Sequence, residues 1–295
     1  MKVIIGTRKS NLALYQTNLV KGILEKNGFS VEIMPITTSG DKLKDKILSD
    51  FGGKGLFVKE IEEALLDFRC DIAVHSLKDV PYQIPKGLKL LAFLEREDPR
   101  DCLILKDGKI RDDMVLGTSS LRRKVQIERI FPKVKILPIR GNLETRIKKI
   151  KTENLDGVVL ALAGLKRMGF EKSAGHIFDP FDLIPAVGQG VIAVEGREGD
   201  EKFEFLRKIL NNKETEEVVK AERAFLTELK GSCKVPIGAF CKKEKNLYHM
   251  VCFISSPDGK NFLRVEGIGD DPEELGKGLA NNLLLKGGDK IIEEI

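Results

Sequence analysis

The sequence contains no tryptophan and only three histidines, and these shortages exclude several kinds of site. Proteins that bind single strands stack bases on aromatic side chains, so an aromatic content of 6% gives little support to a nucleic-acid module. His75 and His176 have no partner pattern typical of a catalytic triad or a metal site. We expect His75 to end a strand in a hydrogen-bonded position, and we expect no metal cofactor.

Cysteine is also scarce: there are five, an odd number without the density of a disulfide framework. This favours a reducing compartment. A zinc site built from Cys233, Cys241, His249 and Cys252 would lack the close C-x-x-C pair of structural zinc sites. We expect Cys241 and Cys252 to lie in a core instead.

Long apolar runs are absent, since no segment approaches the ~18 residues that span a bilayer. The opening MKVIIGTRKS has only a three-residue apolar run, so we expect no secretory signal and a cytoplasmic protein. The net charge of +5 is too small to indicate nucleic acid by itself. A length of 295 residues predicts two or three domains.

The first segment predicts a strand, a turn and a helix. Residues 3–5 form a short apolar run, residues 6–9 a turn, and Ser10 a plausible N-cap. In open α/β sheets, anions bind beyond the carboxyl ends of strands, where helix N-termini offer N–H groups. Arg8 and Ser10 fall in that place, although a solvated arginine and a structural cap would look the same.

Two further features follow in the same part of the chain. The polar segment 37–55, with its glycines and charges, predicts an active-site lid or a mobile loop. A strand over residues 71–75 leads into Lys78 and Asp79, which lie just past its carboxyl end. A lysine beside an aspartate on a turn is usually solvated, but this position favours a functional role.

Three strand–helix units then carry arginines, which we expect at or just inside the start of each helix. The predicted strands cover residues 115–117, 134–139 and 157–161, and the arginines are Arg122, Arg123, Arg140, Arg146 and Arg167. Positive charge at a helix N-terminus opposes the macrodipole, so an anionic partner is expected. Guanidinium groups bind carboxylates bidentately, which suits a ligand with many carboxylates. Polyphosphate and nucleic acid are the competing anions.

One cysteine lies where it could react. The loop GSCKVPIG (231–238) follows a predicted helix over residues 214–229, and Pro236 prevents that helix from resuming. Lys234 beside Cys233 favours the thiolate. Because free cysteine is often buried, a packed Cys233 is the alternative.

The order of elements predicts an α/β fold with a smaller α+β part. After PAVGQG (185–190), an apolar run returns to the first domain, and the end of the chain mixes helices with strands. We expect domain 1 over residues 1–95 plus 190–212, domain 2 over 96–189, and domain 3 over 213–295.

Taken together, the sequence resembles the porphobilinogen deaminase family over nearly its whole length. The motifs that carry the resemblance occur in one order and are GTRKSNLALYQ (6–16), GGKGLFVKEIE (52–62), DIAVHSLKDVP (71–81), GTSSLRR (117–123), RGNLETR (140–146), LAGLKR (162–167), PAVGQG (185–190) and ERAFLTELKGSCKVPIG (222–238). The resemblance implies two doubly wound domains like those of periplasmic binding proteins, and a third domain carrying a cysteine loop.

The family resemblance also implies a reaction. Four porphobilinogen molecules are joined head to tail with loss of ammonia into hydroxymethylbilane, primed by a dipyrromethane cofactor held through a thioether. Cys233 matches the attachment cysteine, and Asp79 matches the carboxylate that contacts pyrrole nitrogens. Cofactor contacts match Lys78, Asp79, Thr118, Ser119, Ser120, Arg122 and Arg123. Contacts to the substrate's acetate and propionate groups match Arg8, Ser10, Arg140, Arg146 and Arg167.

The resemblance implies a monomer that hands its product to uroporphyrinogen III synthase, without membrane or nucleic-acid partners. Two positions depart from the family pattern: Asp50 replaces a lysine before the GGKG stretch, and Gly196 replaces a cysteine. The competing function is a non-catalytic bilobal protein that binds organic anions. That function would explain the arginines but not Asp79 or the cysteine loop.

Overall fold

The computed structural model describes residues 1–42, 55, 57–231 and 235–293. These residues form two compact units, unit 1 comprising Met1–Glu97 with Val191–Glu217, and unit 2 comprising Asp98–Gly190 with Val218–Ile295. No helix among the described residues is both long and apolar enough to cross a membrane.

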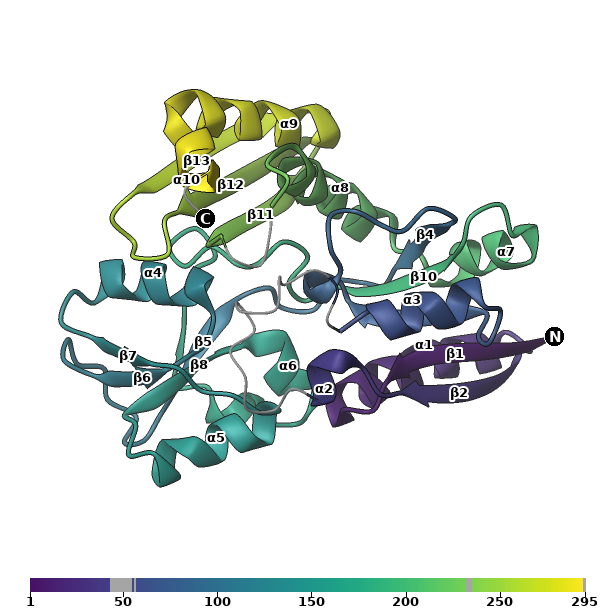
Figure 1. The fold of residues 1–295 in the computed structure, drawn as a ribbon, viewed down its shortest axis with the longest axis horizontal. Helices are drawn as coiled ribbons and strands as arrows, with labels where there is room; N and C mark the ends of the chain where they lie inside the picture. The colour runs from purple at the N-terminus through teal and green to yellow at the C-terminus, as the bar shows by residue number, and fades with distance from the viewer. Residues whose placement is uncertain (43–54, 56, 232–234, 294–295) are drawn as a thin grey trace. The chain divides into compact units, whose positions relative to one another are not determined.

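Unit 1 is built on a five-stranded sheet (Figure 1). Its strands, in spatial order, are β2 (Ser30–Ile36), β1 (Lys2–Arg8), β3 (Ile72–Ser76), β10 (Ile192–Arg197) and β4 (Leu88–Phe93). Strand β1 pairs in parallel with β2 and β3, whereas β10 pairs antiparallel with β3 and β4. The apolar run after PAVGQG therefore returns to the first sheet.

Helices cover both faces of this sheet. Because side chains alternate along a strand, Val3 and Ile5 pack in one core with helices α1 (Asn11–Lys26) and α7 (Glu201–Leu210). On the opposite face, α3 (Lys59–Leu66) packs against the remaining side chains of β1 and β3. A short helix α2 (Ser39–Lys42) follows β2, and a 3-10 helix (Leu77–Asp79) follows β3.

Unit 2 contains a second five-stranded sheet of closely related plan. Its strands are β7 (Lys135–Leu137), β6 (Val115–Gly117), β8 (Gly157–Ala161), β5 (Asp101–Leu105) and β9 (His176–Ile177). Again three neighbouring strands are parallel and the fourth, β5, is antiparallel to its neighbours. Its helices are α4 (Leu121–Ile130), α5 (Leu143–Thr152), α6 (Leu162–Arg167) and a 3-10 turn (Glu171–Ser173).

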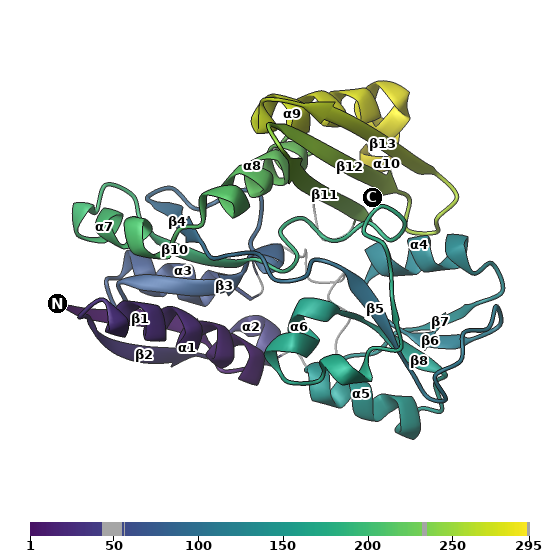
Figure 2. The ribbon, with the colours of Figure 1, turned by 180° about the vertical axis from the view of Figure 1, so that it is seen from behind.

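The end of unit 2 is a three-stranded antiparallel sheet covered by helices (Figures 1 and 2). Its elements are α8 (Lys213–Glu228), β11 (Ile237–Glu244), β12 (Leu247–Ser255), β13 (Phe262–Gly269), α9 (Pro272–Leu283), the turn η4 (Leu284–Gly288) and α10 (Asp289–Glu293). Phe225, Cys241, Cys252 and Leu283 lie in its core. The prediction that Cys241 and Cys252 are core residues is confirmed.

Side-chain caps start several of these helices. Ser10 accepts a hydrogen bond from the N–H of Ala13 at 3.3 Å, and Ser120 accepts one from Arg123 at 3.4 Å. Asn142 and Asp271 cap α5 and α9 in the same way. Each such cap stabilises a helix by about 1 kcal/mol. The predicted capping role of Ser10 is confirmed.

The predicted fold class is confirmed, with local differences. Strand β1 extends through Arg8, so residues 6–8 are strand rather than turn. Strand β5 begins at Asp101, shortly after the boundary predicted between domain 1 and domain 2 at residues 95–96. Of the two departures from the family pattern, Asp50 lies outside the described residues. At Gly196, a Cβ atom would lie 2.4 Å from Leu91 Cδ1, so a side chain there requires Leu91 to move.

Candidate active site

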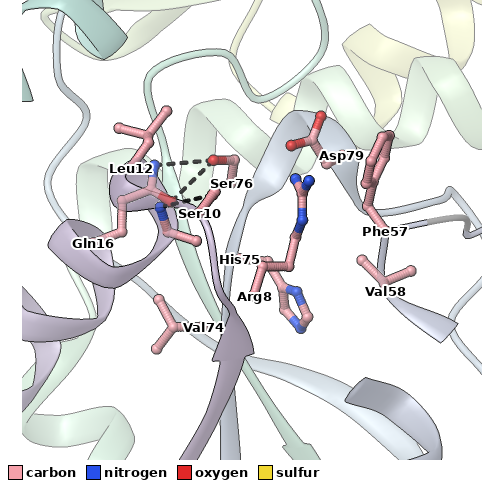
Figure 3. A pocket seen from close by; sticks show the side chains of 11 residues that line it. Arg8, Ser10, Leu12, Gln16, Phe57, Val58, Val74, His75, Ser76 and Asp79 are labelled. Atoms are coloured by element: carbon pink, nitrogen blue, oxygen red, sulfur yellow. Dashed lines mark hydrogen bonds between the residues drawn. The ribbon is translucent and has the colours of Figure 1, made fainter. Parts of the chain in front are cut away.

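Unit 1 contains a small cavity of about 60 Å³ where β1 and β3 end and α1 begins (Figure 3). This is the edge at which α/β sheets bind ligands. Its lining residues come from β1, α1, the segment before α3, β3 and the 3-10 helix, and are Arg8, Ser10, Leu12, Ala13, Gln16, Phe57, Val58, Val74, His75, Ser76 and Asp79. Three residues predicted from the sequence, Arg8, Ser10 and Asp79, are thus brought together.

Arg8 is held in this cavity by a carboxylate of the same chain. Its Nη2 donates to Asp41 Oδ1 at 2.5 Å, and its Cζ lies 4.2 Å from the centroid of the Phe57 ring. Burial alone would raise the pKa of Asp41, but the Arg8 guanidinium and Thr38 outweigh it and hold that pKa below its ordinary value. Among the described residues, the buried Nε of Arg8 has no hydrogen-bond partner.

Asp79 reaches the cavity from the 3-10 helix that follows β3. The helix is fixed by its backbone, because Leu77 N donates to Val191 O and Val80 N donates to Leu77 O, each at 3.0 Å. Asp79 itself is exposed, and so is the adjacent Lys78. A firmly held turn therefore presents a solvent-accessible carboxylate to the cavity.

Beneath the cavity is a buried cluster of three ionisable residues, Glu62, His75 and Glu195. His75 Nε2 lies 3.0 Å from Glu195 Oε2, and the side chains of this pair are only 2% and 0% exposed. The expected hydrogen bond of His75 is confirmed. Burial, followed by the charge of Glu195, raises the pKa of Glu62 to about 7, while His75 acts in the opposite direction.

In unit 2, Arg122 and Arg123 share one buried carboxylate. Arg122 Nη2 donates to Asp101 Oδ2 at 2.6 Å, and Arg123 donates to Oδ1 through Nη2 at 2.8 Å and Nε at 3.1 Å. Burial alone would raise the pKa of Asp101, but the two guanidinium charges outweigh it and lower this pKa to about 2. Asp101 is thus an anionic partner of the arginines at the start of α4.

The surroundings of Asp101 tie together several segments of unit 2. Gln189 Nε2 donates to Asp101 Oδ1 at 3.0 Å and to the carbonyl of Pro99 at 2.7 Å. Arg122 Nη1 also donates to the carbonyl of Ile184 at 2.6 Å. Through Asp101, strand β5 is therefore linked to helix α4 and to the PAVGQG segment.

The predicted hydroxyl residues lie at the start of α4. Thr118 is buried and its Oγ1 accepts a hydrogen bond from Ser120 N at 3.2 Å, whereas Ser119 is exposed and donates to Ile139 O at 2.7 Å. Together with Arg122 and Arg123, these residues form one group at the carboxyl end of β6.

The other predicted arginines of unit 2 are half-buried. Arg140 precedes α5, and Arg146 within α5 donates from Nε to Gly141 O at 2.8 Å. The prediction that Arg167 lies near the start of its helix is wrong. Helix α6 is only six residues long, and Arg167 is its last residue. Its charge there is favourable to the helix dipole, so the dipole argument for an anionic partner does not apply to it. Its Nη2 donates to Gly190 O at 2.6 Å.

Comparisons with known proteins agree over the whole chain. The family profile described as "Porphobilinogen deaminase, dipyromethane cofactor binding domain" matches residues 3–205, and "Porphobilinogen deaminase, C-terminal domain" matches residues 216–285. The chain belongs to the porphobilinogen deaminase family. The porphobilinogen deaminase of Geotalea uraniireducens is 48% identical, covering 99% of this chain and 94% of that protein. That of Oceanobacillus iheyensis is 44% identical, covering 100% and 97%.

Among solved structures, an ancestral cationic amino acid solute-binding protein aligns with a TM-score of 0.43. Its sequence identity is 16%, and the match covers 75% of this chain and 93% of that one. A likeness at this level carries no argument about function.

Within the porphobilinogen deaminase motifs, Cys233 lies outside the described residues. The elements on either side of it in sequence, α8 and β11, are joined by the buried carboxylate of Glu222. Glu222 Oε1 accepts from Cys241 N at 2.9 Å, and Oε2 accepts from Gly188 N at 2.7 Å. The segment that carries Cys233 therefore begins and ends on elements fixed by the same side chain.

Sequence reasoning missed Asp41, Asp101 and the Glu62–Glu195 pair. The apolar run directly after Asp101 was a signal for a strand and thus for a buried aspartate at its start. Asp41 gave no comparable signal, because it lies among polar residues of the 37–55 segment. The predicted lid in that segment falls largely on residues 43–54, which are outside the described residues.

Replacing Glu62 with glutamine is expected to stabilise the protein at about pH 8 by on the order of 3 kcal/mol, and much less at about pH 5. The folded-state pKa of about 7 lies above the ordinary value of 4.5, so folding favours the protonated form and stability falls as pH rises through this window. Urea unfolding at both pH values measures the effect, with the exposed Glu63→Gln as control. An equal effect at both pH values would contradict the expectation.

Proposed function

We propose that this chain joins four porphobilinogen molecules head to tail, with loss of ammonia, into the linear tetrapyrrole hydroxymethylbilane. The observation that carries the proposal is the match of both family profiles, which together cover most of the chain. The family's cofactor-binding profile spans the residues that contribute Asp79 and the arginine groups of both units. These features favour catalysis over simple binding of an organic anion.

We propose that a dipyrromethane cofactor is bound through a thioether to Cys233. Asp101 carries one negative charge against the two positive charges of Arg122 and Arg123, which leaves positive charge to attract a cofactor carboxylate. Lys78, Thr118, Ser119 and Ser120 would supply further charge or hydrogen bonds. The donor set therefore suits a group with acidic side chains. When bound, the cofactor supplies the pyrrole end to which substrate units are added.

The substrate's acetate and propionate groups are proposed to bind Arg8, Ser10, Arg140, Arg146 and Arg167. Arg8 supports this role because its Nε is buried and has no hydrogen-bond partner among the described residues. Arginine binds planar carboxylates through two parallel hydrogen bonds. Arg8 makes one hydrogen bond to Asp41, from Nη2 to Oδ1 at 2.5 Å.

Asp79 is proposed as the catalytic carboxylate. Loss of ammonia from porphobilinogen leaves a cationic azafulvene, and a fixed anion stabilises that charge as it develops. Asp79 suits this role because a backbone-bonded turn holds it at the cavity that also contains Arg8.

We further propose the three-domain division given above, a cytoplasmic monomer, and transfer of the product to uroporphyrinogen III synthase. Domain 1 would comprise residues 1–95 and 190–212, domain 2 residues 96–189, and domain 3 residues 213–295. The return of β10 to the first sheet supports the discontinuous first domain.

The function is tested by incubating the purified chain with porphobilinogen and measuring ammonia and hydroxymethylbilane. We expect one ammonia molecule for each porphobilinogen consumed, and a product mass of a linear tetrapyrrole. Binding of porphobilinogen without release of ammonia would instead support the anion-binding function.

Asp79→Asn is expected to lower kcat about a hundredfold, because loss of one such electrostatic interaction costs about 3 kcal/mol. The folded state and the attached cofactor should be retained, as measured by circular dichroism and intact mass. Asp67→Asn, an exposed substitution outside the cavity, is the control. Near-normal kcat in Asp79→Asn would contradict the role of this carboxylate.

A further inference from the structure

The buried cluster beneath the unit 1 cavity contains a histidine that the proposed function does not use. His75 lines the cavity together with Arg8 and Asp79, and lies below the Arg8 guanidinium in the view of Figure 3. Its Nε2 is engaged by Glu195 Oε2 at 3.0 Å. Among the described residues, none hydrogen-bonds to its Nδ1. Nε2 is thus fixed by Glu195, while Nδ1 has no hydrogen-bond partner among the described residues although the side chain is only 2% exposed.

The sheet explains this arrangement. Val74 belongs to the core on the α1 face, so the alternation of β3 turns His75 toward the α3 face. Val194 likewise packs on the α1 face, which turns Glu195 toward α3 and places it beside His75. The register of β3 and β10 pairs His75 with Ala193, two residues from Glu195 on the antiparallel strand. The contact is therefore determined by strand pairing and not by a mobile loop.

The hydrogen bond to Glu195 also selects the tautomer of the neutral ring. A carboxylate accepts only, so the proton lies on Nε2 and the lone pair on Nδ1. The same arrangement of carboxylate and imidazole makes histidine a general base in other enzymes. Glu195 is the acceptor by position, because its Oε2 lies 3.0 Å from Nε2 of His75.

We propose that His75 is the base that accepts the proton lost from a pyrrole carbon when each new carbon–carbon bond forms. This inference rests on the proposed function. Each addition forms one C–C bond and breaks one C–H bond at the attacking pyrrole carbon. The electron pair of the C–H bond restores the aromatic ring, the proton moves to Nδ1 of His75, and it is later released to solvent. Glu195 is then a positioning residue that stabilises the imidazolium as it forms.

Other charged groups lie around the His75–Glu195 pair and affect how the rate depends on pH. Glu62 and Glu63 come from α3, Arg8 from β1, and Asp79 from the 3-10 helix that follows β3. The next charged residue of β10, Arg197, is held by the carbonyls of Leu65 and Cys70.

The first test is the rate of His75→Asn measured across pH with porphobilinogen as substrate. A general base contributes about a hundredfold or more, so kcat should fall by at least that factor while KM changes much less. In the wild-type protein, kcat should fall at low pH as the base becomes protonated. His75→Asn should lack this fall, because it has no base to protonate. His249→Asn, which removes the half-exposed histidine of another His–Glu pair in unit 2, is the matched control and should keep the wild-type profile.

The second test uses porphobilinogen deuterated at its free α carbon. If His75 takes this proton, C–H cleavage becomes slower in His75→Asn and the kinetic isotope effect on kcat increases relative to wild type. Glu195→Gln should also lower kcat and increase the isotope effect, because an amide can donate to Nε2 and shift the ring proton to Nδ1.

Nitrogen-15 NMR of histidine-labelled protein gives a readout that does not depend on turnover. We expect the Nε2–H tautomer of His75 in the wild-type protein and its loss in Glu195→Gln. A wild-type pH profile and isotope effect in His75→Asn, or the opposite tautomer in the wild-type protein, would overturn the role of His75. Failure of the wild-type chain to release ammonia would instead overturn the proposed function, so the two failures are distinguishable.

Discussion

Replacing Asp101 with asparagine is expected to lower the free energy of unfolding by about 3–5 kcal/mol, because it leaves two buried guanidinium charges without their carboxylate. Arg122 and Arg123 are 7% and 6% exposed, and Asp101 is fully buried, so water cannot replace the lost partner. Urea unfolding of the full chain measures the loss. The matched control is Asp107→Asn, which breaks the exposed pair with Arg111 and should cost less than about 1 kcal/mol.

The pKa of Asp101 predicts how the stability difference between the wild-type and Asp101→Asn proteins depends on pH. The folded-state pKa of about 2 lies below the ordinary value of 3.8, so Asp101 contributes its full stability above 3.8. That contribution is lost as the pH falls through 2. The wild-type and Asp101→Asn proteins should therefore approach each other in stability under strong acid. Equal stability of the two proteins near neutral pH would show that the Asp101 cluster does not hold unit 2 together.

Replacing Cys233 with serine is expected to abolish both the activity and the covalently added mass. A serine hydroxyl cannot form the thioether, so the growing chain would have no attachment. The wild-type protein should exceed its sequence mass by two pyrrole units, and peptide mapping should place that adduct on Cys233. The variant should remain folded but unfold at a lower temperature, because a bound cofactor stabilises the native state.

The four described cysteines supply the controls for that experiment. All four are buried. Burial raises the pKa of Cys70 to about 11 and that of Cys102 to about 12, so these thiols stay protonated and are poor nucleophiles. Cys70→Ala should therefore keep the added mass. An adduct mapped to another cysteine, or unmodified wild-type protein with full activity, would contradict the attachment at Cys233.

The sequence predicted the elements of the fold better than it predicted the partners of its charged residues. Apolar runs located β3, β6 and β8 to within one residue, because buried strands of an α/β sheet are apolar throughout. The motifs also placed Arg8, Ser10 and Asp79 in one region, since each lies at or just past the end of β1 or β3 at the same edge of the sheet.

The partners could not be predicted because each lies far away in sequence. Asp101 contacts arginines 21 and 22 residues later, and His75 contacts Glu195 across 120 residues. Periodicity reports which face a side chain occupies, but it says nothing of which strand lies alongside. Arg167 was misplaced for a local reason: Gly169, with a φ of 73°, ends α6 just after Arg167, and this stop signal was overlooked.

The position of β10 in the first sheet has a consequence for the order in which the chain can fold during synthesis. The ribosome makes β1 to β4 early, but the strand that lies between β3 and β4 ends only at Arg197. The second sheet needs no later segment, because all of its strands lie between Asp101 and Ile177. Domains generally fold in order from the N-terminus during synthesis. Here, however, all strands of the second sheet are synthesised before the last strand of the first sheet. Until β10 emerges, β3 and β4 present unpaired edges that a nascent chain must keep from aggregating.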